Sequence, residues 1–309
     1  MTGTWPASFM LRKYSEDPVN SNHQAENIPI DLIMFGRTGP KVTVVGLGGE
    51  GILRTYGQEK GAQAVIEEAI AQGITYFDSA RVYAGSESYY RLVWSKSSEA
   101  RKRIFQASKS ARRDRQGALA DLELSLATMG IDYLDLWQIH DVRTKKELKK
   151  IAGPGGALEA FLKAKEAGKT RYIGVTGHHD PNVLTTAVVE WPVDSVMLPV
   201  NPVEGALGGF LDKTLPAALK KGIAVIGMKI LGASDYVFPD KGITPEMLIR
   251  YALSQNITVA IVGCSTPAHV HTLARMGRDF EPMSLEDQTA LVDWFQPYIS
   301  RLAYYRGVI

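Results

Sequence analysis

Four side chains capable of acid–base chemistry follow short apolar runs of this chain. Asp78 ends the run ITYFD, and Tyr83 follows it in the segment SARVYAGSE. Lys109 ends RIFQASK, and His140 ends LWQIH. If the three runs are neighbouring parallel strands of a barrel, their carboxyl ends meet at one rim. A carboxylate, a phenol, an ammonium and an imidazole would then lie close together.

This set of groups suits the reduction of a carbonyl. Hydride addition builds negative charge on the carbonyl oxygen, which requires a proton donor and hydrogen-bonding groups already in place. We expect the charge of Lys109 to lower the pKa of Tyr83, because a nearby cation stabilises a phenolate. Asp78 would hold Lys109 in place, and His140 would donate to the substrate oxygen. Each residue alone has an ordinary explanation as turn, packing or solvated surface, so only their joint occurrence favours chemistry.

Eight β-prone runs recur along the chain, each followed by a segment with helical spacing of apolar residues. The runs are VTVVG, ITYFD, RIFQAS, YLDLWQI, RYIGV, SVMLPV, IAVIGM and TVAIVG. Four of the helical segments end at a glycine: Gly73, Gly130, Gly168 and Gly222. The alternation predicts a parallel sheet covered by helices, and eight units favour an α/β fold of the (β/α)8 TIM barrel type over an open doubly wound sheet.

The two ends of the chain depart from this repeat. Residues 1–29 show neither strand nor helix periodicity, which predicts an N-terminal extension to a single barrel domain over 30–309. The runs IDLIMF and KVTVVG flank a turn-forming segment at 36–40, which predicts an N-terminal β-hairpin. After the eighth unit, Ser284 could cap one further C-terminal helix.

Composition narrows the function further. Hydrophobic residues make up 45% of the 309 residues, and 35 Lys and Arg against 33 Asp and Glu leave a net charge of +2. So small a charge does not favour nucleic acid or a membrane surface as a partner, and a small-molecule substrate is expected. Cys264 alone cannot form an internal disulfide or a thiolate cluster. With no apolar run of about 18 residues and no secretory signal, we expect a cytoplasmic protein.

Gly46, Gly48 and Gly51 spell a dinucleotide fingerprint after the first run. In that motif a helix must open at the third glycine, yet helical periodicity here begins only near residue 60. The segment is therefore interpreted as a glycine-rich loop, which lets a ligand approach the backbone closely.

The strings FDSARVYAGSE, ASK, QIHD, FGRTGPKVTVVGLGGEG and VGCSTPAHV, in this order, resemble the aldo-keto reductase superfamily. The resemblance runs from about residue 33 to the terminal helix. It implies a (β/α)8 barrel, closed at its base by the hairpin, that binds NADPH and reduces aldehydes or ketones. It also implies that Asp78, Tyr83, Lys109 and His140 are the catalytic residues.

The same resemblance implies a set of cofactor-binding positions. They are Gly49, Glu50, Thr176, Gly177, Met228, Lys229, Ile230, Leu231, Gly263, Ser265, Thr266 and His269. Several depart from the family pattern. Gly177 and Met197 stand where amide-binding side chains are usual, which His178 or Asn201 would have to replace, and Met228 stands where an aromatic is frequent. A basic partner for a 2′-phosphate is lacking, but backbone amides at the start of a helix near Pro267 still offer an anion site, so NADP(H) is favoured and NAD(H) stays possible.

Two other functions remain open from the sequence. One is a barrel that binds a nicotinamide cofactor to sense or regulate, with vestigial turnover. The other, less favoured, is a metal-dependent hydrolase built on His140, His178, His179 and Asp180, although further ligands from other strands are lacking and no metal is expected.

Charged and aromatic residues beside the pocket bear on the substrate without identifying it. Glu50, Arg54 and Arg81 suggest either a polar or acidic substrate or a solvated ion pair at the rim. Tyr304 or Tyr305 could reach the mouth or simply pack on the barrel. The oligomeric state has no signature in the sequence.

Overall fold

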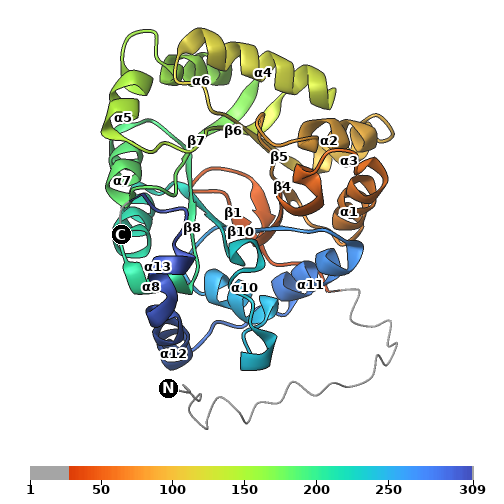
Figure 1. Ribbon diagram of the computed structural model, residues 1–309. Helices are drawn as coiled ribbons and strands as arrows, with labels where there is room; N and C mark the ends of the chain where they lie inside the picture. The colour runs from red at the N-terminus through yellow and green to blue at the C-terminus, as the bar shows by residue number, and fades with distance from the viewer. Residues whose placement is uncertain (1–27, 308–309) are drawn as a thin grey trace.

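The computed structural model of the chain describes residues 28–307. Its centre is a closed barrel of parallel strands in the order β10-β3-β4-β5-β6-β7-β8-β9 (Figure 1). The strands are β3 (Val45–Gly48), β4 (Tyr76–Phe77), β5 (Phe105–Ser110), β6 (Leu134–Ile139), β7 (Thr170–Thr176), β8 (Ser195–Pro199), β9 (Ala224–Met228) and β10 (Val259–Gly263). The predicted (β/α)8 barrel is confirmed, and all eight predicted runs supply a strand.

Helices surround the barrel, as Figure 1 shows. They are α1 (Glu59–Ala71), α2 (Ser86–Trp94), α3 (Ser98–Arg103), α4 (Arg115–Met129), α5 (Lys145–Ala152), α6 (Ala157–Glu166), α7 (Pro181–Glu190), α8 (Pro202–Leu207), α9 (Leu215–Lys221), α10 (Pro245–Leu253), α11 (Pro267–Arg278), α12 (Leu285–Phe295) and α13 (Ile299–Leu302). Capping residues mark the ends of several of these helices. Thr144 and Glu147 form a capping box at α5, while Gly130 and Gly222 end α4 and α9 in the left-handed conformation. Ser284 caps α12, which confirms the extra C-terminal helix.

An antiparallel hairpin of β1 (Leu32–Met34) and β2 (Lys41–Thr43) precedes the barrel, as predicted. Phe35, in the turn, is buried at the base of the barrel, with its ring centroid 4.6 Å from that of Phe105. The sequence placed the first barrel strand from about residue 42, which is wrong at its start. Residues 41–43 pair with β1, and the strand that pairs with β4 and β10 begins only at Val45. One apolar run serves two sheets, which local composition does not reveal.

The barrel interior is a packed core below a polar rim. Tyr76, Phe105, Leu136, Ile226 and Val259 belong to one buried cluster inside the barrel. Alternate residues of the same strands belong to a second cluster that includes the surrounding helices. Side chains alternate between the inside and the outside of the barrel along each strand. The apolar cluster therefore fills the barrel interior, and the polar groups at the carboxyl ends of the strands lie at its rim.

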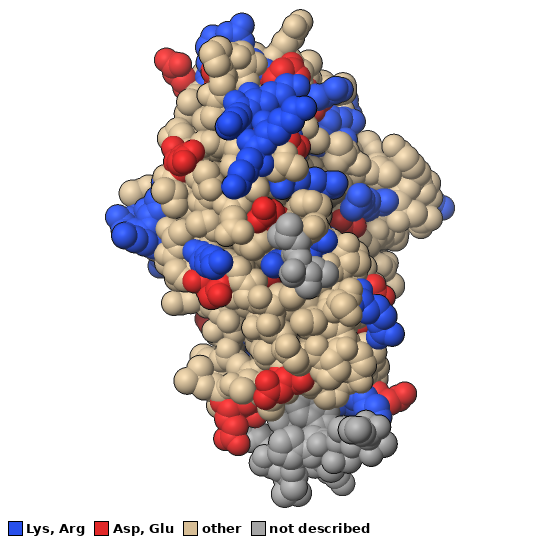
Figure 2. All heavy atoms as spheres, turned by 60° about the vertical axis from the view of Figure 1, so that its left-hand side comes forward, with Lys and Arg blue, Asp and Glu red and all other residues tan. Residues whose placement is uncertain are grey.

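Residues 1–27 lie outside the described residues, so the predicted extension over 1–29 and the domain boundary stay predictions. Within 28–307, no helix is both long and apolar enough to cross a membrane. In Figure 2, basic side chains gather toward the upper end of the face shown, whereas acidic ones are spread over it from top to bottom. The small net charge is thus distributed unevenly over that face.

Candidate active site

Asp78 and Lys109 form a buried ion pair at the carboxyl ends of β4 and β5. Lys109 Nζ donates to Asp78 Oδ2 at 2.5 Å and to the carbonyl oxygen of Ser79 at 2.7 Å. Both residues are only 1% exposed. A buried charge requires such pairing because an isolated one is costly to desolvate. The expectation that Asp78 holds Lys109 in place is met by this geometry.

Tyr83 lies against this pair from the loop between β4 and α2. Lys109 Nζ lies 4.8 Å from the centroid of the Tyr83 ring, over its face. Gly49 also approaches the ring, and a Cβ at Gly49 would lie 2.8 Å from it. Any larger residue at position 49 would therefore displace the tyrosine. The glycine-rich loop approaches the Tyr83 ring through Gly49.

His140, which follows β6, completes the group. Its ring lies edge-on to that of Tyr83 with centroids 5.6 Å apart. Within residues 28–307, its buried Nδ1 has no hydrogen-bond partner. Burial and the charge of Lys109 lower the pKa of His140 to about 3, so its imidazole is neutral at physiological pH. A neutral imidazole can still donate one hydrogen bond.

The pKa of Tyr83 shifts in the direction opposite to the one expected. Burial raises it well above its ordinary value, and the carboxylate of Asp78 adds to the shift. Lys109 does not reverse it, because its ammonium lies over the ring face and its hydrogen bonds go to Asp78 and Ser79. Burial also lowers the pKa of Lys109, against the opposing charge of Asp78. Tyr83 is therefore a neutral phenol that retains its proton.

The loop carrying Tyr83 is fixed from behind by a second buried carboxylate. Glu87 is 2% exposed, pairs with Arg81, and accepts a hydrogen bond from Ser108 Oγ at 2.7 Å. The backbone N–H of Arg81 donates to the carbonyl oxygen of Lys109 at 3.0 Å. Arg81 thus pairs with Glu87 while it also lines a pocket beside Tyr83, and its contact with a substrate stays a prediction.

Glu50 and Arg54 form an ion pair at the rim, 2.5 Å apart, with about half of each side chain exposed. The guanidinium of Arg54 lies 4.8 Å from the centroid of Tyr83. Gly263 packs so tightly on this loop that a Cβ there would lie 2.7 Å from the Glu50 carbonyl carbon. The solvated ion pair expected as one alternative is what the structure contains.

A shallow groove of about 410 Å³ lies between the loops that follow β3 and β10. Its lining comprises Gly51, Ile52, Thr55, Gln58 and Ser265, none of them charged. Hydroxyl, amide and backbone donors of this kind fit the ribose and adenine of a dinucleotide, and nothing in the lining selects for an additional phosphate.

Thr266 and His269 form hydrogen bonds with neighbouring residues beside that groove. The Thr266 hydroxyl accepts from the His269 N–H at 3.3 Å and caps α11, while the Ser265 N–H donates to His269 Nδ1 at 3.3 Å. These bonds hold the start of α11 next to Ser265. The predicted adenosine-binding residues are thus close together.

The predicted nicotinamide positions lie at the ends of β7 and β9. Thr176 Oγ1 accepts from the Asp141 N–H at 2.8 Å, which leaves its own proton free to be donated. Gly177 has no room for a side chain, since a Cβ would lie 3.0 Å from the Val142 carbonyl oxygen. Met228 is half-buried at the upper end of the barrel interior. Met228 and Thr176 therefore face the same rim as the catalytic candidates.

Lys229 follows Met228 with a left-handed backbone, φ 56°, which is uncommon for a residue other than glycine. Ile230 is buried and Leu231 half-buried behind it. Ala233 and Ser234 of the same loop also have positive φ. Backbone strain of this kind persists only where the surroundings impose it, and it concentrates at functional sites.

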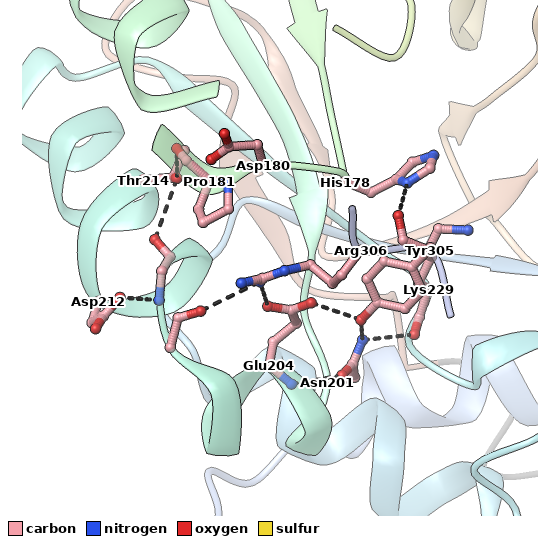
Figure 3. A network of polar contacts seen from close by, with 12 residues as sticks. His178, Asp180, Pro181, Asn201, Glu204, Asp212, Thr214, Lys229, Tyr305 and Arg306 are labelled. Carbon is pink, nitrogen blue, oxygen red and sulfur yellow. Dashed lines mark hydrogen bonds and ion pairs between the residues drawn. The ribbon is translucent and has the colours of Figure 1, made fainter. Parts of the chain in front are cut away.

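The chain after α13 returns to the rim through a buried network, drawn in Figure 3. Tyr305 Oη donates to Glu204 Oε1 at 2.8 Å, and Arg306 pairs with Glu204 Oε2 at 2.6 Å. Asn201 Nδ2 lies 3.1 Å from Tyr305 Oη and donates to the Lys229 carbonyl oxygen at 3.1 Å. We call Asn201, Glu204, Tyr305 and Arg306 the tail network. It occupies the amide of Asn201, so the idea that Asn201 replaces a missing amide ligand is wrong.

His178, His179 and Asp180 do not converge on one point. His178 Nδ1 donates to the Tyr305 carbonyl oxygen at 3.2 Å, and its Nε2 lies 3.2 Å from Asp141 Oδ1. Asp180 caps α7. Over residues 28–307, no group of three or more His, Cys, Asp or Glu side chains could hold a metal ion.

Sequence reasoning missed three charged residues of the site. Asp141 adopts φ 55° and bridges His178 and Arg143. Glu204 and Arg306 form the buried pair of the tail network. Asp141 had a detectable signal, as the acidic residue directly after His140. The partners of Glu204 lie about a hundred positions away, beyond any local pattern.

Comparisons with known proteins agree with this architecture. Residues 44–236 match the Aldo/keto reductase family, and the chain belongs to that family. It is 33% identical over 176 residues to the NADP(+) aldo-keto reductase yakc of Schizosaccharomyces pombe, covering 52% of this chain and 50% of that protein. It is 29% identical over 215 residues to L-galactose dehydrogenase of Arabidopsis thaliana, covering 64% of each. The matched regions thus span between half and two thirds of these relatives.

Solved structures extend the similarity of the fold. An aldo-keto reductase from Klebsiella pneumoniae in complex with NADPH superposes with a TM-score of 0.70 at 20% identity, covering 86% of this chain and 95% of that one. The holo form of aldo-keto reductase AKR11C1 from Bacillus halodurans gives 0.69 at 17% identity, covering 91% and 98%. At such identities the likeness concerns the barrel itself.

Proposed function

We propose that this protein is an NAD(P)H-dependent oxidoreductase that reduces an aldehyde or ketone to an alcohol, or catalyses the reverse reaction. The observation that carries the proposal is the grouping of Asp78, Tyr83, Lys109 and His140 at the ends of β4, β5 and β6. Family membership and the NADP(H) named for its relatives support the same class of reaction.

When bound, the cofactor would supply the hydride from nicotinamide C4 to the carbonyl carbon. Tyr83 then gives its phenolic proton to the carbonyl oxygen, and the resulting phenolate regains a proton from solvent. The neutral His140 imidazole donates a hydrogen bond to the same oxygen. The Lys109 ammonium over the Tyr83 ring stabilises the negative charge that Tyr83 acquires.

The cofactor would lie along the ends of β7, β9 and β10. Thr176 would offer a hydroxyl to the nicotinamide amide, Met228 would contact the nicotinamide, and Ser265 with the neighbouring groove would receive the adenosine. The uncharged groove makes NAD(H) a real competitor, while the relatives favour NADP(H). The thermal shift with each nucleotide compares the two, because the tighter ligand stabilises more at equal concentration.

The decisive variant is Tyr83→Phe, which removes the proposed proton donor and keeps the ring that contacts Gly49 and Lys109. Reduction of a reactive aldehyde by NADPH, followed at the nicotinamide absorbance, should fall about a hundred- to ten-thousandfold. Binding of NADPH, measured by fluorescence, should stay within about twofold of the unmodified protein. Unchanged turnover would remove Tyr83 from the mechanism. Tight nucleotide binding without turnover of any aldehyde or ketone tested would instead favour a sensor.

A further inference from the structure

Two consecutive backbone carbonyl groups at His140 and Asp141 are bound by one guanidinium. Arg113, in the loop between β5 and α4, donates from Nη1 to the His140 carbonyl oxygen at 2.8 Å and from Nη2 to that of Asp141 at 2.7 Å. Its Nε donates to Glu147 Oε1 at 2.9 Å. All three nitrogens of the guanidinium are therefore bound, two of them to the backbone that carries the imidazole.

The backbone conformation at Asp141 makes this double contact possible. In an extended strand successive carbonyl groups point to opposite sides, so one guanidinium could not reach both. Asp141, two residues after the end of β6, instead adopts a left-handed φ of 55°. Residues other than glycine rarely adopt this conformation, and it persists only where the surroundings impose it. The chain thus turns at the end of β6 so that both carbonyls face Arg113.

The neighbouring strands hold the N–H groups of the same turn. The His140 N–H donates to the Ser110 carbonyl oxygen at the end of β5 at 2.9 Å. The Asp141 N–H donates to Thr176 Oγ1 at the end of β7 at 2.8 Å. Together with the bonds from Arg113, these contacts hold the N–H and the carbonyl group of both residues. The imidazole of His140 is therefore attached to a backbone with little freedom to move.

Arg113 is itself fixed in place. Its side chain is only 14% exposed, and its carbonyl oxygen accepts from the Ala157 N–H at 3.1 Å. The next residue, Asp114, forms an antiparallel bridge with Gly156 and caps α4. A planar guanidinium held in this way presents its N–H groups in a rigid fork. The ion pair with Glu147 could be made by a lysine as well, whereas the two carbonyls require the fork of an arginine.

We propose that Arg113 is a positioning residue for His140 and holds the turn so that the imidazole meets the substrate oxygen beside Tyr83. The inference rests on the function proposed above, because it concerns the place of His140 in that reaction. Arg113 contacts the backbone of the turn and acts only through His140. Donation to a developing charge requires placement to within about 0.5 Å, so a looser turn lowers the rate of reaction more than the binding of the cofactor.

The test compares Arg113→Lys with Arg112→Lys. Arg113→Lys keeps the positive charge, which contributes less than burial to the lowered pKa of His140, and removes the fork. Arg112 is the matched control, since it is the preceding residue, its side chain is 63% exposed, and it lies 3.7 Å from its acidic partner Asp121. Thermal unfolding establishes that each variant folds.

With a reactive aldehyde and NADPH, the kcat of Arg113→Lys should fall about ten- to a hundredfold. The affinity for NADPH, measured by fluorescence, should stay unchanged, and Arg112→Lys should match the unmodified protein in both measurements. The same substitution is then made together with His140→Ala. Because Arg113 acts through His140, Arg113→Lys should cause no further loss in that background. An unchanged kcat in Arg113→Lys, or an equal loss with and without His140, would overturn the proposal.

Nuclear magnetic resonance of the histidine rings tests the same contact without turnover. The protein has six histidines, and the signals of His140 are those that His140→Ala removes. Arg113→Lys should shift the signals of the ring nitrogens of His140, and Arg112→Lys should leave them in place. If no aldehyde is reduced but these signals still move, the positioning role of Arg113 stands and only the reductase assignment fails. Signals that stay in place in Arg113→Lys contradict the positioning role, whether or not aldehydes are reduced.

Discussion

The two sides of the barrel rim are built in different ways. On one side, Asp78, Lys109 and His140 each end or directly follow a strand, and they meet because β4, β5 and β6 are neighbours. On the other side, the tail network joins α8 to residues near the C-terminus. Both sides contain a fully buried ion pair, but only the first is set by the order of the strands.

Each side of the rim also contains a group whose pKa is shifted by burial. Burial lowers the pKa of His140 to about 3 on the strand side and raises that of Glu204 to about 7 on the tail side. Both shifts favour the neutral form. Burial disfavours the charged form of both groups, and at Glu204 it outweighs the opposing charge of Arg306, which lies 2.6 Å away.

The largest effect is expected from breaking the pair on the strand side. Lys109→Met leaves Asp78 buried without its cation, which should lower the free energy of unfolding by about 3–5 kcal/mol. Denaturant unfolding measures the loss. Asp78→Asn combined with Lys109→Met should destabilise by less than the sum of the single variants, since no orphaned charge remains. As a control, Lys102→Met breaks an equally short but exposed pair with Glu99 and should cause no measurable loss.

A pair of variants tests the opposite titrations of the two sides. An unfolded histidine takes up a proton near pH 6.5 whereas folded His140 does not, so His140 lowers stability as the pH falls from 6.5 toward 3. Folded Glu204 takes up its proton near pH 7 and unfolded Glu204 near 4.5, so Glu204 raises stability as the pH falls through that range. In the unmodified protein the two contributions oppose each other.

Between about pH 7.5 and about pH 5, each contribution amounts to about 2 kcal/mol. His140→Asn should therefore gain stability on acidification relative to the unmodified protein, and Glu204→Gln should lose it. Denaturant unfolding at both pH values gives, for each variant relative to the unmodified protein, the slope of the free energy of unfolding against pH. Slopes of the same sign in the two variants would contradict the assignment of opposite shifts.

The smallest effect is expected at the exposed pair of the rim. Arg54→Met removes a guanidinium that is about half exposed and pairs with Glu50 in solvent. The free energy of unfolding should therefore change by only about 0.2–1 kcal/mol. Turnover of an uncharged aldehyde should change by less than about threefold. A much larger loss of turnover would mean that Arg54, above the ring of Tyr83, takes part in the reaction.

Much of the site was predictable because strands deliver side chains in a regular way. Once eight βα units were recognised, Asp78, Lys109 and His140 had to meet at one rim. The pKa of Tyr83 was not predictable. The direction of its shift depends on whether the Lys109 ammonium faces the ring or the hydroxyl of Tyr83. That difference of a few ångströms cannot be predicted from the spacing of residues along the chain.

The sequence by itself determined the repeat of strands and helices, the hairpin and the four residues proposed for catalysis, because periodicity, turn residues and strand ends are local properties. Only the tertiary structure decided that residues 41–43 leave the barrel for the hairpin. It alone decided that Glu204 meets Tyr305 and Arg306 and that Arg113 meets the backbone of His140. Those contacts join positions far apart in the chain, and their energies depend on burial that exists only after the barrel has closed.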